Sequence, residues 1–128
     1  MVQKQRYVEL KSVSYPSHSS FPAGRYTIRI TMRFEWDLEK ELINIKKHGI
    51  DFTLASKVFD DPNLALIKDR IDHETGEQRW HAIGVASVDE EAALLVVAHV
   101  YRGQNEEKII RIISAREASK RERRLYIQ

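Results

Sequence analysis

The sequence predicts an α+β domain in which two N-terminal helices and one C-terminal helix pack on a small antiparallel sheet. Two patterns support this fold class. Apolar residues recur at helical spacing between residues 37 and 59, and the period then changes to two, with many β-branched residues, up to residue 114. The 128 residues are enough to bury one core without disulfides, and the chain contains no cysteine.

The first 31 residues differ in composition from the remainder of the chain. Residues 11–24 contain five serines, two prolines and a glycine, so we interpret them as a linker or disordered segment. Residues 25–31 alternate in hydrophobicity and can extend a strand, but a globular start is clearer at Met32. We therefore expect a flexible or appended N-terminal extension over residues 1–31 and a folded domain over residues 32–128.

Two helices are expected after this start. Asp37 is a suitable N-cap for the first helix, which should end before Gly49, because glycine suits the left-handed conformation that follows a helix. Asp51 can cap a second helix that runs through Phe59 and is ended by Pro62. The apolar stripes of the two helices consist of Leu38, Leu42 and Ile45, and of Phe52, Ala55 and Phe59.

A strand-rich segment with a basic end follows. Period-two runs predict strands near residues 64–68, 78–87, 93–101 and 108–114. Ser114 and Glu117 then form a Ser-x-x-Glu capping box, which predicts that the final helix starts there. Between Lys108 and Arg124 there are seven basic side chains and only two acidic ones. Such a density is typical of a surface that binds phosphates or an acidic partner.

The sequence indicates neither a membrane protein nor a cofactor enzyme. Its longest apolar run, residues 92–98, is much shorter than the roughly 20 residues that cross a membrane, and its N-terminus lacks the apolar core of a signal peptide. We therefore expect a cytoplasmic protein. No metal-ligand spacing, glycine-rich phosphate loop or serine-nucleophile motif is present, so no metal or cofactor is expected.

The predicted strands carry groups that can cleave RNA. Cleavage without a metal requires a base for the 2′-hydroxyl, an acid for the leaving oxygen and cations that neutralise the phosphorane. Polar residues that stand where a strand would usually have apolar ones are Glu77, Arg79, His81, His99, Arg111 and Arg116. Of these, His81 is interpreted as a structural or exposed residue. If the last two strands fold symmetrically about Asn105, His99 lies opposite Arg111 on one face. The cation would then make this histidine a better base near neutral pH.

These candidates also have ordinary structural explanations. His99 can be a hydrogen-bonded residue that ends an apolar strand, and Glu77 with Arg79 can be a surface ion pair of little energetic weight. The cations of the last helix can form a solvated face. Arg116 is different, because a cation in the first turn of a helix opposes the helix dipole. It should therefore have a specific partner, either a carboxylate such as Glu77 or a phosphate.

Four motifs together resemble a known family. They are FEWDLEK at residues 34–40, KKHGIDF at residues 46–52, VFDDP at residues 58–62 and IIRIISAREASKRERRLY at residues 109–126. In order and spacing they are similar to the BrnT family, the toxin half of bacterial type II toxin–antitoxin pairs. The resemblance covers about residues 32–126, and residues 1–31 lie outside it.

The resemblance implies a RelE-like fold and a metal-independent ribonuclease that arrests translation. It also implies a BrnA-type antitoxin with a ribbon-helix-helix domain, through which alone operator DNA would be bound. Together with the chemistry of the residues, it gives these catalytic candidates: His99, Arg79, Arg111, Glu77 and Lys47. The candidates for RNA binding are Arg116, Ser114, His48, Lys120, Arg123 and Tyr126. Exposed bases of single-stranded RNA could stack on Trp80, Tyr101 or Tyr126, although an aromatic residue in a strand is usually part of the core.

A second class of function stays open at this point. The chain can also be a non-catalytic module whose basic end docks an acidic protein segment. RNA cleavage that survives a chelator and falls with Arg111→Ala would support the enzyme, whereas RNA binding without strand scission would support the module. An independent DNA-binding protein is less favoured, because no helix-turn-helix or ribbon pattern is present.

Overall fold

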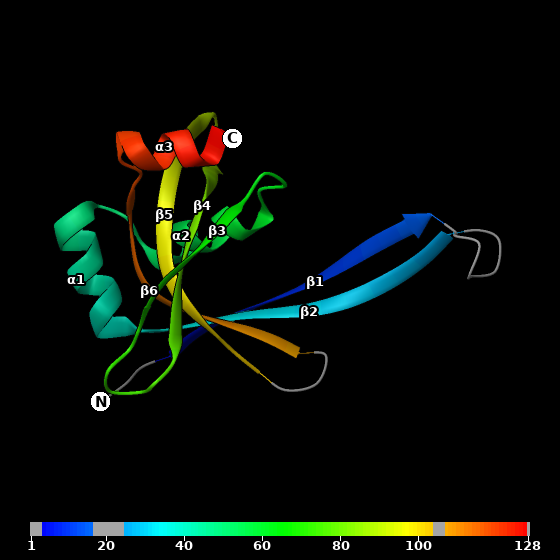
Figure 1. The fold of residues 1–128 in the computed structure, drawn as a ribbon, viewed down its shortest axis with the longest axis horizontal. Coiled ribbons are helices and arrows are strands. Elements are labelled where there is room, and N and C mark those ends of the chain that lie inside the picture. The colour runs from blue at the N-terminus through cyan, green and yellow to red at the C-terminus, as the bar shows by residue number, and fades with distance from the viewer. Residues whose placement is uncertain (1–3, 17–24, 104–106, 128) are drawn as a thin grey trace.

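The computed structural model describes the backbone of residues 4–16, 25–103 and 107–127, and the side chains of residues 32–103 and 108–127. A long hairpin is followed by short helices, a run of strands and a last helix (Figure 1). The strands are β1 (Lys4–Pro16), β2 (Arg25–Asp37), β3 (Ala65–Ile71), β4 (Gln78–Val88), β5 (Glu91–Arg102) and β6 (Glu107–Glu117). The helices are α1 (Leu38–His48), α2 (Phe52–Ser56), the 3-10 turn η1 (Lys57–Asp60) and α3 (Lys120–Ile127).

The first two helices lie where the sequence predicts them. The carboxylate of Asp37 caps α1 by accepting a hydrogen bond from the backbone N–H of Glu39 (2.9 Å), and Gly49 ends this helix with a left-handed φ of 72°. Asp51 caps α2 by accepting from the N–H of Leu54 at 2.7 Å. The last part of the second predicted helix is the tighter 3-10 turn η1.

The strands form one six-stranded sheet in the order β1-β2-β6-β5-β4-β3. The α+β class and the four predicted strands after the helices are confirmed, but the sheet is mixed, because β2 and β6 run parallel. The prediction of a purely antiparallel sheet is therefore wrong. Alternating hydrophobicity identifies a strand with one buried face, but it does not say in which direction the neighbouring strand runs.

The N-terminal part of the chain differs from the expected linker. The backbone of β1 pairs antiparallel with β2, and the hairpin projects well beyond the other strands (Figure 1). Residues 11–16 therefore belong to a strand. Residues 17–24, the remainder of the expected linker, lie outside the described residues. The division of the chain at residue 31 stays a prediction.

The final helix starts later than predicted. Ser114 and Glu117, the expected capping box, belong to β6, whose pairing with β5 continues to Glu117. A second Ser-x-x-Glu motif five residues on caps α3: the N–H of Ser119 donates to Glu122 Oε1 (2.8 Å), and the N–H of Glu122 donates to Ser119 Oγ (3.2 Å). Pairing with a buried strand thus determined which of the two motifs caps the helix.

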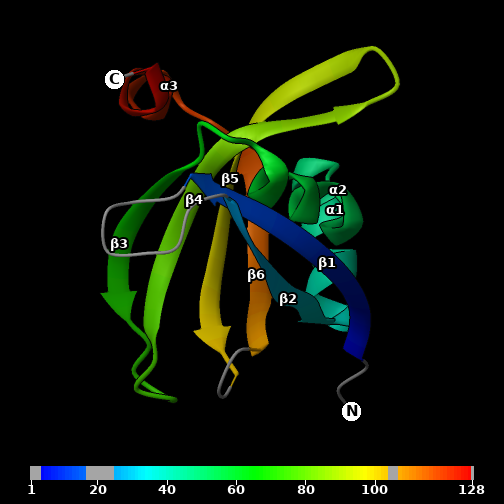
Figure 2. The same ribbon diagram turned by 90° about the vertical axis from the view of Figure 1, so that its right-hand side faces the viewer.

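Helices cover the two faces of the sheet unequally. On one face α1, α2 and η1 enclose the larger core, while α3 lies on the other side of the strands (Figure 2). The largest buried side chains of the first core are Trp36, Phe34 and Phe52. The smaller cluster consists of Ile83, Leu94 and Val96, with Ala118 and Tyr126 packed against it.

Gly84 allows η1 to lie close to β4. A β-carbon at this position would be 2.8 Å from Val58 Cγ1 and 3.1 Å from the Val58 carbonyl oxygen. Both distances are shorter than an ordinary van der Waals contact between these atoms. The absent side chain is therefore what lets the helical layer reach the sheet at this point.

Candidate functional site

The register of β5 and β6 decides which polar side chains share a face. His99 was expected opposite Arg111. In the structure His99 pairs with Ile112, and a register shift separates it from Ala98. Arg111 instead pairs with Val100. Because neighbouring residues of a strand point to opposite faces, His99 and Arg111 lie on opposite sides of the sheet, and the predicted juxtaposition is wrong.

His99 is buried on the helix-covered face. It has no exposed surface, and its ring lies edge-on to the rings of Phe59 and Tyr101, each with a centroid distance of 4.9 Å. Its Nδ1 lies 3.0 Å from the carbonyl oxygen of Val97. Burial lowers the pKa of His99 from 6.5 to about 4, opposed by the Val97 hydrogen bond and assisted by the charge of His81. The imidazole is therefore neutral and out of contact with solvent at neutral pH.

The opposite face of the sheet carries most of the polar strand residues. We call it the arginine face and define it as Arg33, Glu35, Glu77, Arg79, His81, Arg102, Arg111 and Ser114. It contains four arginines and two glutamates, so it is cationic at its centre. Three of the predicted catalytic residues, Glu77, Arg79 and Arg111, and the predicted RNA-binding Ser114 are brought together there.

The arginine face is organised around two small apolar residues of β5. Val100 pairs with Arg111 of β6, and the antiparallel register of β4 places Arg79 on its other side. The two guanidinium-bearing residues are therefore roughly 10 Å apart at the backbone, two strand spacings. In the next row, Ala98 lies between His81 and Ser114. Long polar side chains thus flank a low apolar strip.

A chain of ion pairs crosses one end of this face. Arg102 donates to both carboxylate oxygens of Glu77 at 2.8 and 2.9 Å, and its Nη1 lies 3.3 Å from Glu35 Oε1. The same Glu35 oxygen is 3.5 Å from Nη1 of Arg111. The hydrogen bonds from Arg102 hold the pKa of Glu77 below its usual value, against the effect of burial. Glu77 is therefore an ionised partner that orients Arg102.

Arg79 has a buried donor that no described group satisfies. Its Nε is buried and has no hydrogen-bond partner among the described residues. A buried donor without a partner costs stability, so such groups are rare in folded proteins and are satisfied by a bound ligand where they lie in a binding site. Guanidinium groups match the geometry of phosphate oxygens.

His81, for which the sequence favoured a structural or exposed position, lies on the arginine face. Its Nε2 is 3.4 Å from Asp69 Oδ2 of the neighbouring strand, and about a third of each side chain is exposed (30% and 32%). A histidine that is oriented by a carboxylate and open to solvent can accept or donate a proton. The signal that could have identified it is its position two residues after Arg79, which puts both on one face of β4.

Arg116 has a different environment from the predicted one. It belongs to β6 rather than to the first turn of a helix, and its carboxylate partner is Glu122 rather than Glu77. Its two terminal guanidinium nitrogens, Nη1 and Nη2, donate to the two carboxylate oxygens of Glu122 at 2.6 and 2.7 Å. These hydrogen bonds lower the pKa of Glu122 from 4.5 to about 2. The pair fastens α3 to the end of the sheet, so Arg116 is engaged within the fold.

The other predicted residues lie away from the centre of the arginine face. Lys120 and Arg123 are exposed on α3, and the hydroxyl of Tyr126 donates to Asp61 Oδ2 at 2.6 Å. Lys47 and His48 are exposed in the last turn of α1, on the helix-covered side of the sheet. These residues lie on separate parts of the surface and do not form one site with Arg79.

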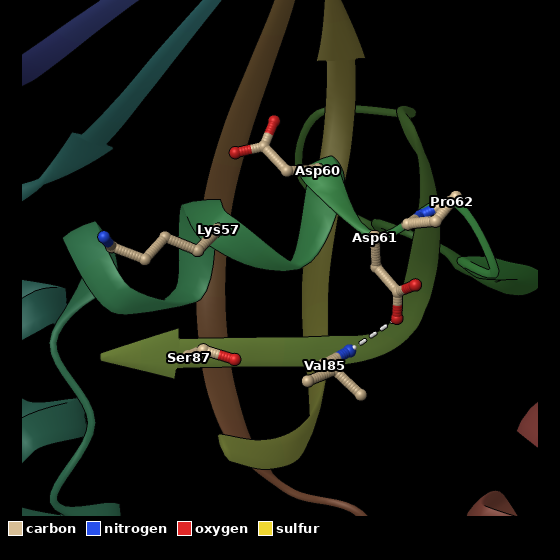
Figure 3. A pocket seen from close by; sticks show the side chains of 6 residues that line it. All are labelled: Lys57, Asp60, Asp61, Pro62, Val85 and Ser87. Atoms are coloured by element: carbon tan, nitrogen blue, oxygen red, sulfur yellow. Dashed lines mark hydrogen bonds between the residues drawn. The ribbon is translucent and has the colours of Figure 1, made fainter. Parts of the chain in front are cut away.

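The described residues also form a pocket of about 400 Å³ beside η1 (Figure 3). It is lined by Lys57, Asp60, Asp61, Pro62, Val85 and Ser87, none of which was a predicted site residue. Within it the N–H of Val85 donates to Asp61 at 2.8 Å, where β4 extends past the paired part of β3. Asp61 thus caps a strand edge and holds Tyr126, which explains its place in the fold.

The described residues show neither a metal-binding cluster nor a membrane-spanning helix. Among the side chains that the structure describes, no cluster of three or more histidine, aspartate or glutamate residues has an arrangement that could bind a metal ion. No described helix combines the length and the apolar character that a membrane span requires.

Comparison with known proteins gives one family. A family model described as "Ribonuclease toxin, BrnT, of type II toxin-antitoxin system" matches residues 36–122, which are 87 of the 128 residues. The matched segment begins in β2 and ends in α3, so it includes β4, β5 and β6 with the central arginines. No match was found among curated proteins.

Proposed function

Because the chain belongs to the BrnT family of ribonuclease toxins, we propose that it is the toxin of a bacterial type II pair and cleaves RNA on the arginine face without a metal. The observation that supports this site is the placement of Arg79 and Arg111 on either side of Val100, with the Nε of Arg79 buried and lacking a partner among the described residues. The helices on one face of the sheet and the polar residues on the other are consistent with a RelE-like architecture.

The two arginines supply charge neutralisation. When the 2′-oxygen of RNA attacks the adjacent phosphorus, negative charge builds up on the phosphoryl oxygens before the bond to the 5′-oxygen breaks. Arg79 and Arg111 approach this phosphate from opposite sides of β5. Arginine keeps its proton near neutral pH, so the proton for the leaving 5′-oxygen comes from solvent. Glu35 orients Arg111, and Glu77 orients the neighbouring Arg102, until RNA competes for these carboxylates.

His81 is the base that this geometry supports. It is open to solvent, is oriented by Asp69 and stands one row from the arginines, next to Ser114 across Ala98. His81 removes the proton of the 2′-hydroxyl, and attack by this oxygen then forms a 2′,3′-cyclic phosphate. In this proposal Ser114 donates a hydrogen bond to the phosphate. His99 stabilises the core, and Lys47 takes no part in the cleavage step.

Single-stranded RNA is the proposed substrate. Trp80 and Tyr101 form an edge-to-face pair with centroids 6.1 Å apart on the helix-covered side, next in sequence to Arg79 and Arg102. Lys68 lies over the Trp80 ring (5.8 Å) and Lys108 over the Tyr101 ring (5.4 Å). In this proposal an RNA strand passes from the arginine face around the ends of β4 and β5 to these rings. A base then replaces the exposed lysine ends there, while the lysines bind phosphates.

The proposed function includes binding to an antitoxin. The toxin–antitoxin family implies such a partner, and we propose that it is of the BrnA type, with a ribbon-helix-helix domain that carries all contact with operator DNA. Cleavage of RNA would arrest translation in the cytoplasm. Lys120 and Arg123, exposed on α3, would then bind the RNA backbone electrostatically.

The test is RNA cleavage by purified protein in the presence of a chelator. Arg79→Ala and Arg111→Ala should each lower the rate by about 10²–10³, the usual cost of removing one group that stabilises a developing oxyanion. His81→Asn should lower it by about 10²–10⁴. Arg70→Ala, at an exposed arginine of β3, is the matched control and should leave the rate unchanged. RNA binding without scission by the wild-type protein would instead support a non-catalytic module.

A further inference from the structure

Helix α1 exposes an apolar stripe. In this helix Leu38, Leu42 and Ile45 recur at positions i, i+4 and i+7, a spacing typical of the side that faces a core. The structure leaves them 40%, 58% and 40% exposed, and Ile43 is 64% exposed. No other helix carries so many exposed large apolar residues within the described part of the chain. The stripe therefore lacks the cover that its spacing predicts.

Polar side chains explain why α1 is turned this way. Asn44 is the buried residue of the helix: its amide donates to the carbonyl oxygens of Ile50 (2.8 Å) and Ala115 (2.9 Å) and accepts from the N–H of Ala115 (3.0 Å). Glu41 accepts hydrogen bonds from Trp36 Nε1 (3.1 Å) and from the N–H of Phe52 (2.8 Å). These five hydrogen bonds fix the rotation of the helix about its axis, so the apolar stripe cannot turn inward without breaking them.

The charges beside the stripe indicate what covers it. Leu42 and Ile43 are each followed one helical turn later by an exposed lysine, Lys46 and Lys47, and His48 ends the helix. A segment that buries the stripe therefore meets a cationic end. Acidic residues beside apolar ones satisfy both requirements, whereas RNA satisfies only the charge.

We propose that the α1 stripe, defined as Leu38, Leu42, Ile43 and Ile45, is a docking surface for an amphipathic acidic segment of the antitoxin. The surface lies on the helix-covered side of the sheet, away from Arg79 and Arg111. Anchoring on α1 is thus separate from the chemistry of cleavage. The inference depends on the proposed pairing with an antitoxin but not on the cleavage mechanism.

The test compares two doubly substituted proteins for binding to the purified cognate antitoxin of the proposed BrnA type. Leu42→Ser with Ile43→Ser removes the most exposed part of the stripe, and we expect the Kd to rise roughly tenfold or more. Leu66→Ser with Ile71→Ser is the matched control, because these β3 residues are similarly exposed (46% and 58%). The control should keep the wild-type Kd, and both proteins should keep the wild-type cleavage rate and melting temperature.

The other outcomes have separate meanings. An unchanged Kd for the α1 variant would overturn the docking surface while leaving the antitoxin pairing intact. A wild-type protein that does not bind the antitoxin would overturn both. If the α1 substitutions left the Kd unchanged but abolished a dimer of this chain, or weakened its RNA binding, then the stripe would serve a second copy or RNA, and the proposal would be wrong.

Discussion

Replacement of His99 by leucine should remove a large part of the pH dependence of stability. The folded-state pKa of His99 is about 4 and the unfolded value is 6.5, because burial disfavours the imidazolium. Below pH 6.5 the unfolded chain binds a proton that the folded protein does not. The free energy of unfolding is thus unaffected by this residue above pH 6.5 and falls as the pH falls from 6.5 towards 4.

The size of the effect follows from the two pKa values. For a single group with these values, the loss of unfolding free energy between pH 7.5 and pH 5 is roughly 2 kcal/mol. Carboxylates that titrate in the folded protein, such as Glu122 with a pKa of about 2, contribute mainly below pH 4.5. The interval from pH 5 to pH 7.5 therefore isolates His99 from them.

The assay is urea unfolding of the wild-type protein and of His99→Leu at pH 5, 6, 7 and 7.5. Leucine is apolar and similar in volume, and it removes the Nε2 that lacks a partner among the described residues. The wild-type curve should fall by about 2 kcal/mol more than the variant curve between pH 7.5 and pH 5. Parallel curves for the two proteins would refute the account of a neutral, buried His99. Loss of RNA cleavage by a stable His99→Leu protein would return His99 to the catalytic site.

Three further predictions concern packing, the α3 clamp and substrate binding. Gly84→Ala should lower the free energy of unfolding by roughly 1–3 kcal/mol, since the new methyl group meets Val58 at 2.8 Å; an unchanged urea midpoint would contradict that close approach. Glu122→Gln should cost only about 1 kcal/mol in the same assay, because the Arg116 side chain is 39% exposed and solvent screens the pair; a loss of several kcal/mol would mean that the clamp is much stronger than its exposure indicates. Trp80→Leu should weaken binding of single-stranded RNA roughly tenfold with little effect on duplex RNA, and equal losses for both would rule out base stacking.

The sequence predicted the elements of the fold better than their arrangement. The caps Asp37 and Asp51 and the ending at Gly49 could be predicted because each acts within one turn of its own helix. The start of α3 was misplaced because two Ser-x-x-Glu motifs lie five residues apart, and only the pairing of β6 with β5 excludes the first. Residues close in sequence cannot show which of two capping motifs is used when the pairing of a strand distant in sequence determines it.

The residues of the candidate site were likewise predicted better than their arrangement. Arg79, Arg111 and Glu77 were predicted because a charged residue in a strand is unusual, and the structure places all three on the arginine face. His99 was assigned to the wrong face, since one residue of hairpin offset reverses the face of a side chain. His81 was interpreted as structural or exposed, because its neighbour Asp69 belongs to another strand and the sequence does not show that contact.

The rotation of α1 about its axis was also not predictable from the sequence. Spacing alone predicted a core-facing side, but the hydrogen bonds of Asn44 and Glu41 determined the rotation of the helix. A sequence pattern that disagrees with the fold of the single chain is expected where a partner covers the apolar residues.

The most direct test of the arginine face is an NMR titration with a single-stranded RNA whose 2′-hydroxyls are methylated, so that it binds but cannot be cleaved. The largest shifts in backbone amide signals should occur at Arg79, His81, Val100, Arg111 and Ser114, and they should weaken as salt is raised. Shifts confined to α1 or α3, with β4, β5 and β6 unchanged, would contradict the assignment of RNA to this face.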